Sequence, residues 1–155
     1  MTDDNTQYLS LEKKKELETE LKNLQEVKVI SLAKRIDEAR QMGDLSENAE
    51  YHQAREELAW TQSRVKQIVF ILDNAQVIKS DNTTGIINLG SHITVKGSTG
   101  EKEYTIVGGQ EADPVSGKIS NESPLGSAFM GKKKGDRVEV ELPAGTQEYK
   151  ITSVK

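Results

Sequence analysis

Residues 51–75 read YHQAREELAWTQSRVKQIVFILDNA, and this stretch decides the fold of the first half of the chain. Its apolar side chains recur at alternating steps of three and four residues. That spacing is typical of a helix that packs along one side against another helix, as in a coiled coil. Thr61 is the one polar member of the predicted seam, which consists of Tyr51, Ala54, Leu58, Thr61, Val65, Ile68, Leu72 and Ala75.

A second long helix is predicted upstream of this one. Ser10 is a favourable N-cap before Leu11, and apolar residues then recur, with a slip in phase near Lys28 that makes the seam imperfect there. These apolar residues are Leu17, Leu21, Leu24, Val27, Ile30, Leu32, Ile36 and Ala39. The connection between the helices, residues 42–46, is so short that it predicts an antiparallel αα-hairpin. Because two helices alone bury little surface, we expect the hairpin to be an arm attached to a separate body.

The composition of the chain changes sharply after residue 79. Gly43 is the only glycine among residues 1–79, which contain no proline, whereas the other eleven glycines and all three prolines follow. Glycine and proline favour turns and short strands, and their absence permits long helices. The polar stretch 79–85 therefore predicts a boundary between a helical hairpin, residues 1–79, and a globular domain, residues 80–155.

The second half has the pattern of a small antiparallel sheet with one short helix. Apolar and polar residues alternate on both sides of the turn at residues 97–100, and again over residues 138–142. Ser123 is predicted to cap a short helix that begins at Pro124 and ends before Gly131. Together the two halves predict an α+β protein.

Composition excludes several classes of function. The chain has 21 basic and 25 acidic residues, a net charge of −4, which is poorly suited to binding DNA through charge alone. The absence of cysteine excludes disulfides, cysteine-ligated zinc and thiol catalysis, and the two histidines lie far apart in sequence. No apolar stretch approaches the ~20 residues of a membrane-spanning helix, and the first residues lack a secretory signal. We therefore expect a cytoplasmic protein with no membrane partner.

The predicted hairpin tip, residues 43–51, carries two carboxylates three positions apart, Asp44 and Glu47. Carboxylate oxygens suit Mg²⁺, but two of them alone hold it weakly. The tip is therefore predicted to supply half of a metal site that would be completed inside another protein. The alternative is a capping box, in which Asp44 caps the second helix and Glu47 occupies its third position. The metal-site and capping-box interpretations are compatible, because a cap can use one carboxylate oxygen and leave the other available.

The tip sequence resembles the signature of the bacterial transcript cleavage factors of the GreA/GreB family. The resemblance continues along the chain from about residue 9 to residue 154, and the acidic balance is closer to GreA members than to the more basic GreB members. The motifs that carry it are GDLSENAEYH at residues 43–52 with ARE at 54–56, LDNAQVI at 72–78, EAD at 111–113, SNESPLG at 120–126, MGK at 130–132 and GD at 135–136.

The resemblance implies a role in transcription. The hairpin would enter the secondary channel of RNA polymerase, where Asp44 and Glu47 match the family's catalytic acidic pair. They would help to hold a Mg²⁺ ion shared with the polymerase active site, with no cofactor bound to this protein alone. The polymerase would then hydrolyse backtracked nascent RNA near its 3′ end, so that this chain activates an enzyme without being one.

The resemblance also implies contacts elsewhere on the chain. The second half would have an FK506-binding-protein-like fold and would dock on the largest polymerase subunit at the channel rim. Ser123, Pro124, Leu125 and Gly126 are candidates for this docking surface or for packing of the short helix. Arg40 and Arg55 flank the tip and are candidates for contacts to RNA phosphates, the alternative being solvated surface charge.

We expect no small-molecule substrate. Two other functions compete with transcript cleavage. The first is a regulator that occupies the secondary channel and inhibits polymerase without promoting cleavage, for which the intact acidic pair would be unnecessary. The second is a prolyl isomerase, suggested only by the expected fold of the second half. Such an enzyme needs an aromatic pocket, whereas residues 80–155 contain only Tyr104, Phe129 and Tyr149 as aromatic residues.

Overall fold

The structure of the protein, a computed structural model, describes residues 5–79 and 83–155. The described residues form two compact units. The first, here called the arm, is Lys14–Asn74, and the second, here called the body, comprises the residues up to Lys13 and those from Ala75 onward. No helix within the described residues is long and apolar enough to cross a membrane.

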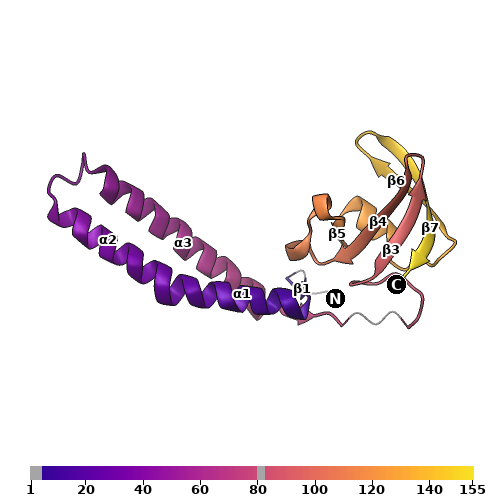
Figure 1. The fold of residues 1–155 in the computed structure, drawn as a ribbon, viewed down its shortest axis with the longest axis horizontal. Helices are drawn as coiled ribbons and strands as arrows, with labels where there is room; N and C mark the ends of the chain where they lie inside the picture. The colour runs from indigo at the N-terminus through magenta and orange to yellow at the C-terminus, as the bar shows by residue number, and fades with distance from the viewer. Residues whose placement is uncertain (1–4, 80–82) are drawn as a thin grey trace. The chain divides into compact units, whose positions relative to one another are not determined.

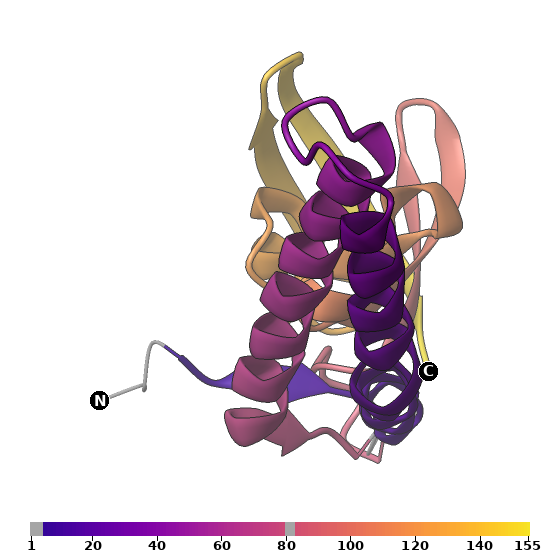
Figure 2. The same cartoon turned by 90° about the vertical axis from the view of Figure 1, so that its left-hand side faces the viewer.

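The predicted helical hairpin is confirmed. Helix α1 (Leu11–Asn23) continues through a single π-helical segment (Leu24–Lys28) into α2 (Val29–Gln41), and α3 (Ala49–Asp73) returns antiparallel beside α2 (Figures 1 and 2). The chain reverses direction between α2 and α3 in a short loop, as the brief connection predicts. This loop, residues 42–48, is called the tip below.

The π-helical segment explains the slip in the apolar pattern near Lys28. A π-helical turn holds one more residue than an α-helical turn, so it rotates the residues that follow it out of the earlier phase. As a result Val27 and Ile30, both predicted to lie in the seam, are 58% and 63% exposed, which corrects that prediction. Lys28 is half-buried and donates a hydrogen bond to Glu57 of α3. The buried residues of the helical segment from α1 to α2 are Leu17, Leu32 and Ala39.

The seam predicted for α3 is largely confirmed. Its buried positions include Tyr51, Ala54, Thr61 and Ile68, whereas Leu58, Val65 and Leu72 are half-buried. Ala75 was predicted as the last member of the seam, but α3 ends before it, at Asp73, which corrects that prediction. Ile71, which the spacing left out, is also buried. The buried hydroxyl of Thr61 donates a hydrogen bond of 2.8 Å to the backbone carbonyl of Glu57, so the one polar member of the seam is satisfied within its own helix.

Charged side chains join the two helices where the apolar seam is interrupted. Arg35 of α2 pairs with Glu50 at 2.7 Å and with Glu57 at 2.9 Å, and Lys28 pairs with the second oxygen of Glu57. Hydrogen bonds from Lys28 and then from Arg35 hold the pKa of Glu57 below its ordinary value. At this position along the arm, the ion pairs of Glu57 therefore join the two helices in place of apolar contacts.

We expect Glu57→Gln to weaken the arm at neutral pH and to reduce its sensitivity to acid. Because the pKa of Glu57 is lowered in the folded state, its contribution to stability is present above the ordinary glutamate pKa and is lost as the pH falls through the lower, folded-state value. Thermal unfolding followed by circular dichroism at pH 7 and at about pH 3.5 measures this loss. The exposed neighbour Glu56, changed to Gln, is the matched control. An unchanged acid sensitivity in Glu57→Gln would contradict the assignment.

The body is built on a five-stranded sheet in the order β5-β4-β3-β7-β6 (Figure 1). The predicted hairpin turn at residues 97–100 is confirmed, since Gly97 and Gly100 are paired at the ends of β3 and β4. The second hairpin, formed by β6 and β7, is also antiparallel. The strands are β3 (His92–Gly97), β4 (Gly100–Val107), β5 (Lys118–Ser120), β6 (Arg137–Leu142) and β7 (Gly145–Val154).

The sheet is mixed, which corrects the prediction of a purely antiparallel one. Strand β5 pairs with β4 in parallel, with Ile106 opposite Ile119. A parallel neighbour requires a crossover connection in place of a hairpin turn. Here the chain between the two strands passes through two short 3₁₀ turns, η2 (Gly109–Glu111) and η3 (Pro114–Ser116).

The short helix predicted after Ser123 is confirmed as α4 (Pro124–Phe129). Ser123 caps it by accepting a hydrogen bond from the amide of Gly126, and Gly131 follows it with a positive φ of 76°. Phe129 of α4 is fully buried within the main core of the body. The other buried members of that core are Ile87, Ile93, Val95, Ile106, Ile119, Val138, Val140, Tyr149 and Ile151.

A second, two-stranded sheet pairs the beginning of the described chain with the segment that leaves the arm. Strand β1 (Gln7–Leu9) lies parallel to β2 (Ala75–Val77), and the carbonyl of the fully buried Leu9 accepts a hydrogen bond of 2.8 Å from the amide of Ile78. These strands are 3 residues long and did not give a recognisable pattern in the sequence.

Within the body, Ser10, the residue before α1, is hydrogen-bonded to the segment after β4. The Glu111 carboxylate accepts hydrogen bonds from the Ser10 amide at 2.8 Å and the Ser10 hydroxyl at 2.6 Å, while that hydroxyl caps α1 by accepting from the Lys13 amide at 3.1 Å. The predicted cap is thus confirmed. Ser10 and Glu111 accordingly belong to the same compact unit.

Candidate functional site

The tip is built from the end of α2, a glycine turn and the start of α3. Gly43 has a positive φ of 110°, a conformation that glycine adopts without strain. Its neighbour Met42 donates to the carbonyl of Ala39 at 3.2 Å and so ends α2. The left-handed residue lets the chain turn away from α2 within one step and places Asp44 directly after the bend.

Asp44 does not cap α3, which corrects the capping-box alternative. One of its carboxylate oxygens, Oδ1, accepts from the amide of Ser46 at 3.2 Å and from the Ser46 hydroxyl at 2.8 Å, forming a small local turn. The N-cap is Asn48, whose Oδ1 accepts from the amide of Tyr51 at 3.1 Å. Glu47 therefore precedes the helix and cannot occupy its third position.

Both tip carboxylates remain available for a partner. Asp44 and Glu47 are exposed, and the hydrogen bonds of Asp44 use Oδ1 only. Within the part of the chain that the structure describes, the Glu47 side chain has no hydrogen bond or ion pair, and no group of three or more potential metal ligands occurs. The donor set fits Mg²⁺ in type, being hard oxygen, but not in number, because Mg²⁺ takes six ligands in an octahedral arrangement.

Arg40 and Arg55 are brought together by Tyr51, a link that the sequence did not reveal. Their guanidinium carbons lie 5.9 Å and 5.6 Å from the centroid of the buried Tyr51 ring, within the range of a cation–π contact. Hydrogen bonding to Arg40, followed by the charges of both arginines, lowers the pKa of the Tyr51 hydroxyl. The two cations are therefore held near one another, close to the tip.

The two arginines also line a groove in the arm of about 420 Å³. Apolar side chains from both helices form much of its remaining lining, which consists of Ala33, Ile36, Leu58, Ala59 and Gln62. The signal that would have found this site in the sequence is the helical spacing of Tyr51 and Arg55, four residues apart on one face.

Three of the four candidate docking residues have structural roles in the body. Ser123 caps α4 and donates from its hydroxyl to the carbonyl of Ser120 at 2.6 Å. Gly126 is buried, and Leu125 packs against the core. Pro124 alone among them is exposed. These contacts show that residues 123–126 stabilise the fold of the body. Their role in docking on a partner stays a prediction.

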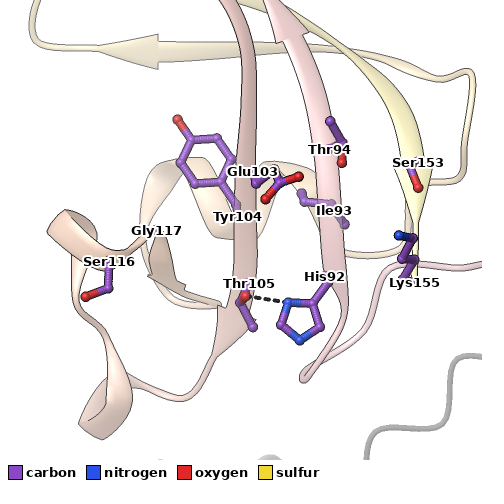
Figure 3. A pocket seen from close by; sticks show the side chains of 10 residues that line it. All are labelled: His92, Ile93, Thr94, Glu103, Tyr104, Thr105, Ser116, Gly117, Ser153 and Lys155. Atoms are coloured by element: carbon purple, nitrogen blue, oxygen red, sulfur yellow. Dashed lines mark hydrogen bonds between the residues drawn. The ribbon is translucent and has the colours of Figure 1, made fainter.

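The body also has a polar depression on its sheet, of about 300 Å³ (Figure 3). It lies over strands β3, β4 and β7, where the Thr105 hydroxyl and His92 Nδ1 are hydrogen-bonded at 2.7 Å. Among its other lining residues are Thr94, Glu103, Ser153 and Lys155. Among the described residues, the Thr105–His92 pair is not extended by a hydrogen bond from the other ring nitrogen of His92, so the third group that orients the base in covalent catalysis is missing from this arrangement.

The aromatic residues that a prolyl isomerase pocket would need are used in the core. Phe129 lies 6.2 Å from Tyr104 and 5.8 Å from Tyr149, measured between ring centroids, and Phe129 is fully buried. The three rings fill the space between α4 and the sheet by packing on one another. This packing argues against the isomerase alternative.

Comparison with known proteins agrees with this arrangement of an arm and a body. Residues 7–77 match the family described as "Transcription elongation factor, N-terminal", and residues 82–155 match "Transcription elongation factor, GreA/GreB, C-term". The two matches divide the chain close to the predicted boundary.

Curated relatives match along nearly the whole chain. The transcription elongation factor GreA of Clostridium acetobutylicum is 44% identical over 144 residues, 91% of each chain, and that of Thermoanaerobacter pseudethanolicus is 44% identical over 150 residues, 95% of this chain and 96% of the relative. Among solved structures, GreA factor homolog 1 (Gfh1) of Thermus thermophilus covers 97% of this chain and 99% of its own, with 23% identity and a TM-score of 0.45. On the strength of the sequence matches, this chain belongs to the GreA/GreB family of transcription elongation factors.

Proposed function

We propose that this protein acts on bacterial RNA polymerase, inserting its arm into the secondary channel and stimulating the polymerase to cleave backtracked nascent RNA. The observation that carries the proposal is the tip, where Asp44 and Glu47 are exposed at the end of a helical hairpin with carboxylate oxygens free for a partner. Membership of the family supports the same function.

The tip supplies an incomplete metal site that suits completion by a second protein. Asp44 and Glu47 would hold Mg²⁺ together with carboxylates of the polymerase. When bound between them, the ion supplies charge neutralisation and a more acidic water at the scissile phosphate. This chain contributes the two carboxylates and the turn that orients Asp44, and the polymerase contributes the rest of the catalytic centre.

The charges next to the tip suit RNA as the substrate in that complex. Arg40 and Arg55 are anchored on Tyr51 and face one groove, which supports a role in binding phosphates of the RNA near its 3′ end. The net charge of the chain is −4, so this local pair of cations, and not the overall charge, would attract the RNA backbone.

The body is proposed to dock on the largest polymerase subunit at the channel rim. The exposed Pro124 at the start of α4 supports a contact there, since a rigid apolar ring on the surface can be buried at little entropic cost. Two attachment points on one chain would raise the effective concentration of the tip at the active site.

We expect the protein alone to hydrolyse no RNA, with or without Mg²⁺, because the tip offers too few ligands to hold the ion. Added to a backtracked elongation complex, it should release a 3′ RNA fragment faster than the polymerase does by itself. The measurement is gel analysis of end-labelled RNA in both mixtures. Cleavage of free RNA would contradict a cofactor role, and polymerase inhibition without cleavage would favour the channel-blocking alternative.

A further inference from the structure

We propose that Asn48 is a positioning residue for the tip: its side-chain amide ties the end of α2 to the start of α3 and so determines where Asp44 and Glu47 are held. The inference rests on the proposed function of these carboxylates. It concerns a residue that makes no contact with RNA or metal in the proposal and acts only through its neighbours.

The amide of Asn48 is hydrogen-bonded at both of its ends. Its Oδ1 accepts from the backbone amide of Tyr51 at 3.1 Å, and its Nδ2 donates to the backbone carbonyl of Ala39 at 2.8 Å. The first bond satisfies an unpaired amide at the start of α3, and the second reaches a carbonyl in the last turn of α2. Ala39 is 2% exposed and Asn48 is half-buried, so the bridge is shielded from water.

A cap alone does not require asparagine at this position. Ser and Asp cap helices about as well as Asn, because each offers an oxygen acceptor. Neither offers an N–H donor in the place of Nδ2. An aspartate at position 48 would set a carboxylate oxygen against the carbonyl oxygen of Ala39, and two acceptors repel each other. The bond to Ala39 is therefore the part of the arrangement that is specific to asparagine.

The tip carboxylates themselves have few contacts, although the backbone of the loop is also held by a hydrogen bond of 3.3 Å between His52 Nε2 and the Ser46 carbonyl and by one of 3.4 Å from the Asn48 amide to the Leu45 carbonyl. Asp44 is bonded only to Ser46, two residues away, and Glu47 has no side-chain partner among the described residues. Their positions consequently depend on the backbone of the loop and on where the loop leaves the two helices, and the Asn48 side chain bonds to both of those helices. Functional groups must be held to about 0.5 Å, and a displacement of about 1 Å can cost 100-fold in rate.

The test compares Asn48→Asp and Asn48→Ser with the native full-length protein on a backtracked elongation complex. Both variants keep the cap, so the melting temperature and the protection of the Tyr51 amide from hydrogen exchange should change little. At saturating protein the cleavage rate should fall about 10- to 100-fold and the half-saturating Mg²⁺ concentration should rise. The protein concentration that gives half-maximal cleavage should stay the same.

Asn74→Asp is the matched control. Asn74 lies at the other end of α3, and its Nδ2 also donates to a backbone carbonyl, that of Phe70, at 2.8 Å. The same chemical change there should leave the cleavage rate at the native value. An equal loss in Asn74→Asp would mean that the effect is not specific to the tip and would overturn the proposal.

Two further outcomes would also overturn it. Native cleavage by Asn48→Asp would show that the cap alone suffices, and full recovery at higher protein concentration would show that Asn48 serves binding and not placement. Asp44→Asn, assayed in parallel, separates these failures from failure of the proposed function. Normal cleavage by Asp44→Asn refutes the role of the tip itself, whereas loss there with normal Asn48 variants refutes only the positioning role.

Discussion

Asp44→Asn and Glu47→Gln should each abolish most of the stimulated RNA cleavage while leaving the protein folded and bound to polymerase. Each substitution removes one anionic oxygen ligand but keeps the size of the side chain. Losing several kcal/mol of charge stabilisation in the transition state corresponds to a fall in rate of about 100-fold or more. The measurement is the cleavage rate as a function of Mg²⁺ concentration at saturating protein.

The structure explains why folding should survive these changes. The N-cap of α3 is Asn48, so neither Asp44 nor Glu47 supports the helix. In Asp44→Asn the side-chain oxygen can still accept from Ser46, which preserves the local turn. Both variants should have the same melting temperature as the native protein and should compete with it for binding to polymerase.

Asp37→Asn is the matched control for Asp44→Asn. Asp37 is an exposed aspartate on α2, and its carboxylate accepts a weak hydrogen bond of 3.4 Å from Gln41, which asparagine can also accept. This variant should cleave at the native rate. Native rates in both tip variants would show that the carboxylates are not part of the catalytic centre.

Gly126→Ala should strongly destabilise the body, although it adds one methyl group to a helix. A Cβ at this position would lie 1.9 Å from the backbone carbonyl oxygen of Ser120, which no side-chain movement can relieve. Overpacking of this kind costs about 1–3 kcal/mol or more, equivalent to a fall in melting temperature of about 10 °C. Differential scanning calorimetry or circular dichroism measures the change.

Ser127→Ala, at the next position of α4, is the control for helix propensity. Ser127 is exposed, and its hydroxyl makes one hydrogen bond of 3.2 Å to the carbonyl of Pro124. Because alanine favours helices, this variant should melt within a few degrees of the native protein. If Gly126→Ala were equally stable, the close approach of α4 to Ser120 would be wrong, and the motif at residues 123–126 would need an explanation through docking.

The features that sequence could predict are those fixed by local interactions. The seam of residues 51–75 and the short connection before it specified an antiparallel hairpin, because helical periodicity and loop length act within a few turns of chain. Ser10 and Ser123 were recognised as caps for the same reason, since a capping side chain bonds to amides only two or three residues away.

The N-cap of α3 could not be predicted from local sequence alone. Asp44 and Asn48 both have side chains that can cap a helix, and the spacing of Asp44 and Glu47 matched a capping box. In the structure Asn48 is the N-cap, and its side chain also bonds to the carbonyl of Ala39 on the opposite helix. That bond joins residues 9 positions apart and depends on how the two helices meet.

By itself, therefore, the sequence determined the two helices, the hairpin turns and the short helix. Only the tertiary structure decided that β1 pairs with β2, that β5 runs parallel to β4, and that Glu111 binds Ser10 within the body. The physical reason is sequence separation: Ser10 and Glu111 are 101 residues apart, and a bond over that distance forms only when the folded chain has already brought its partners together.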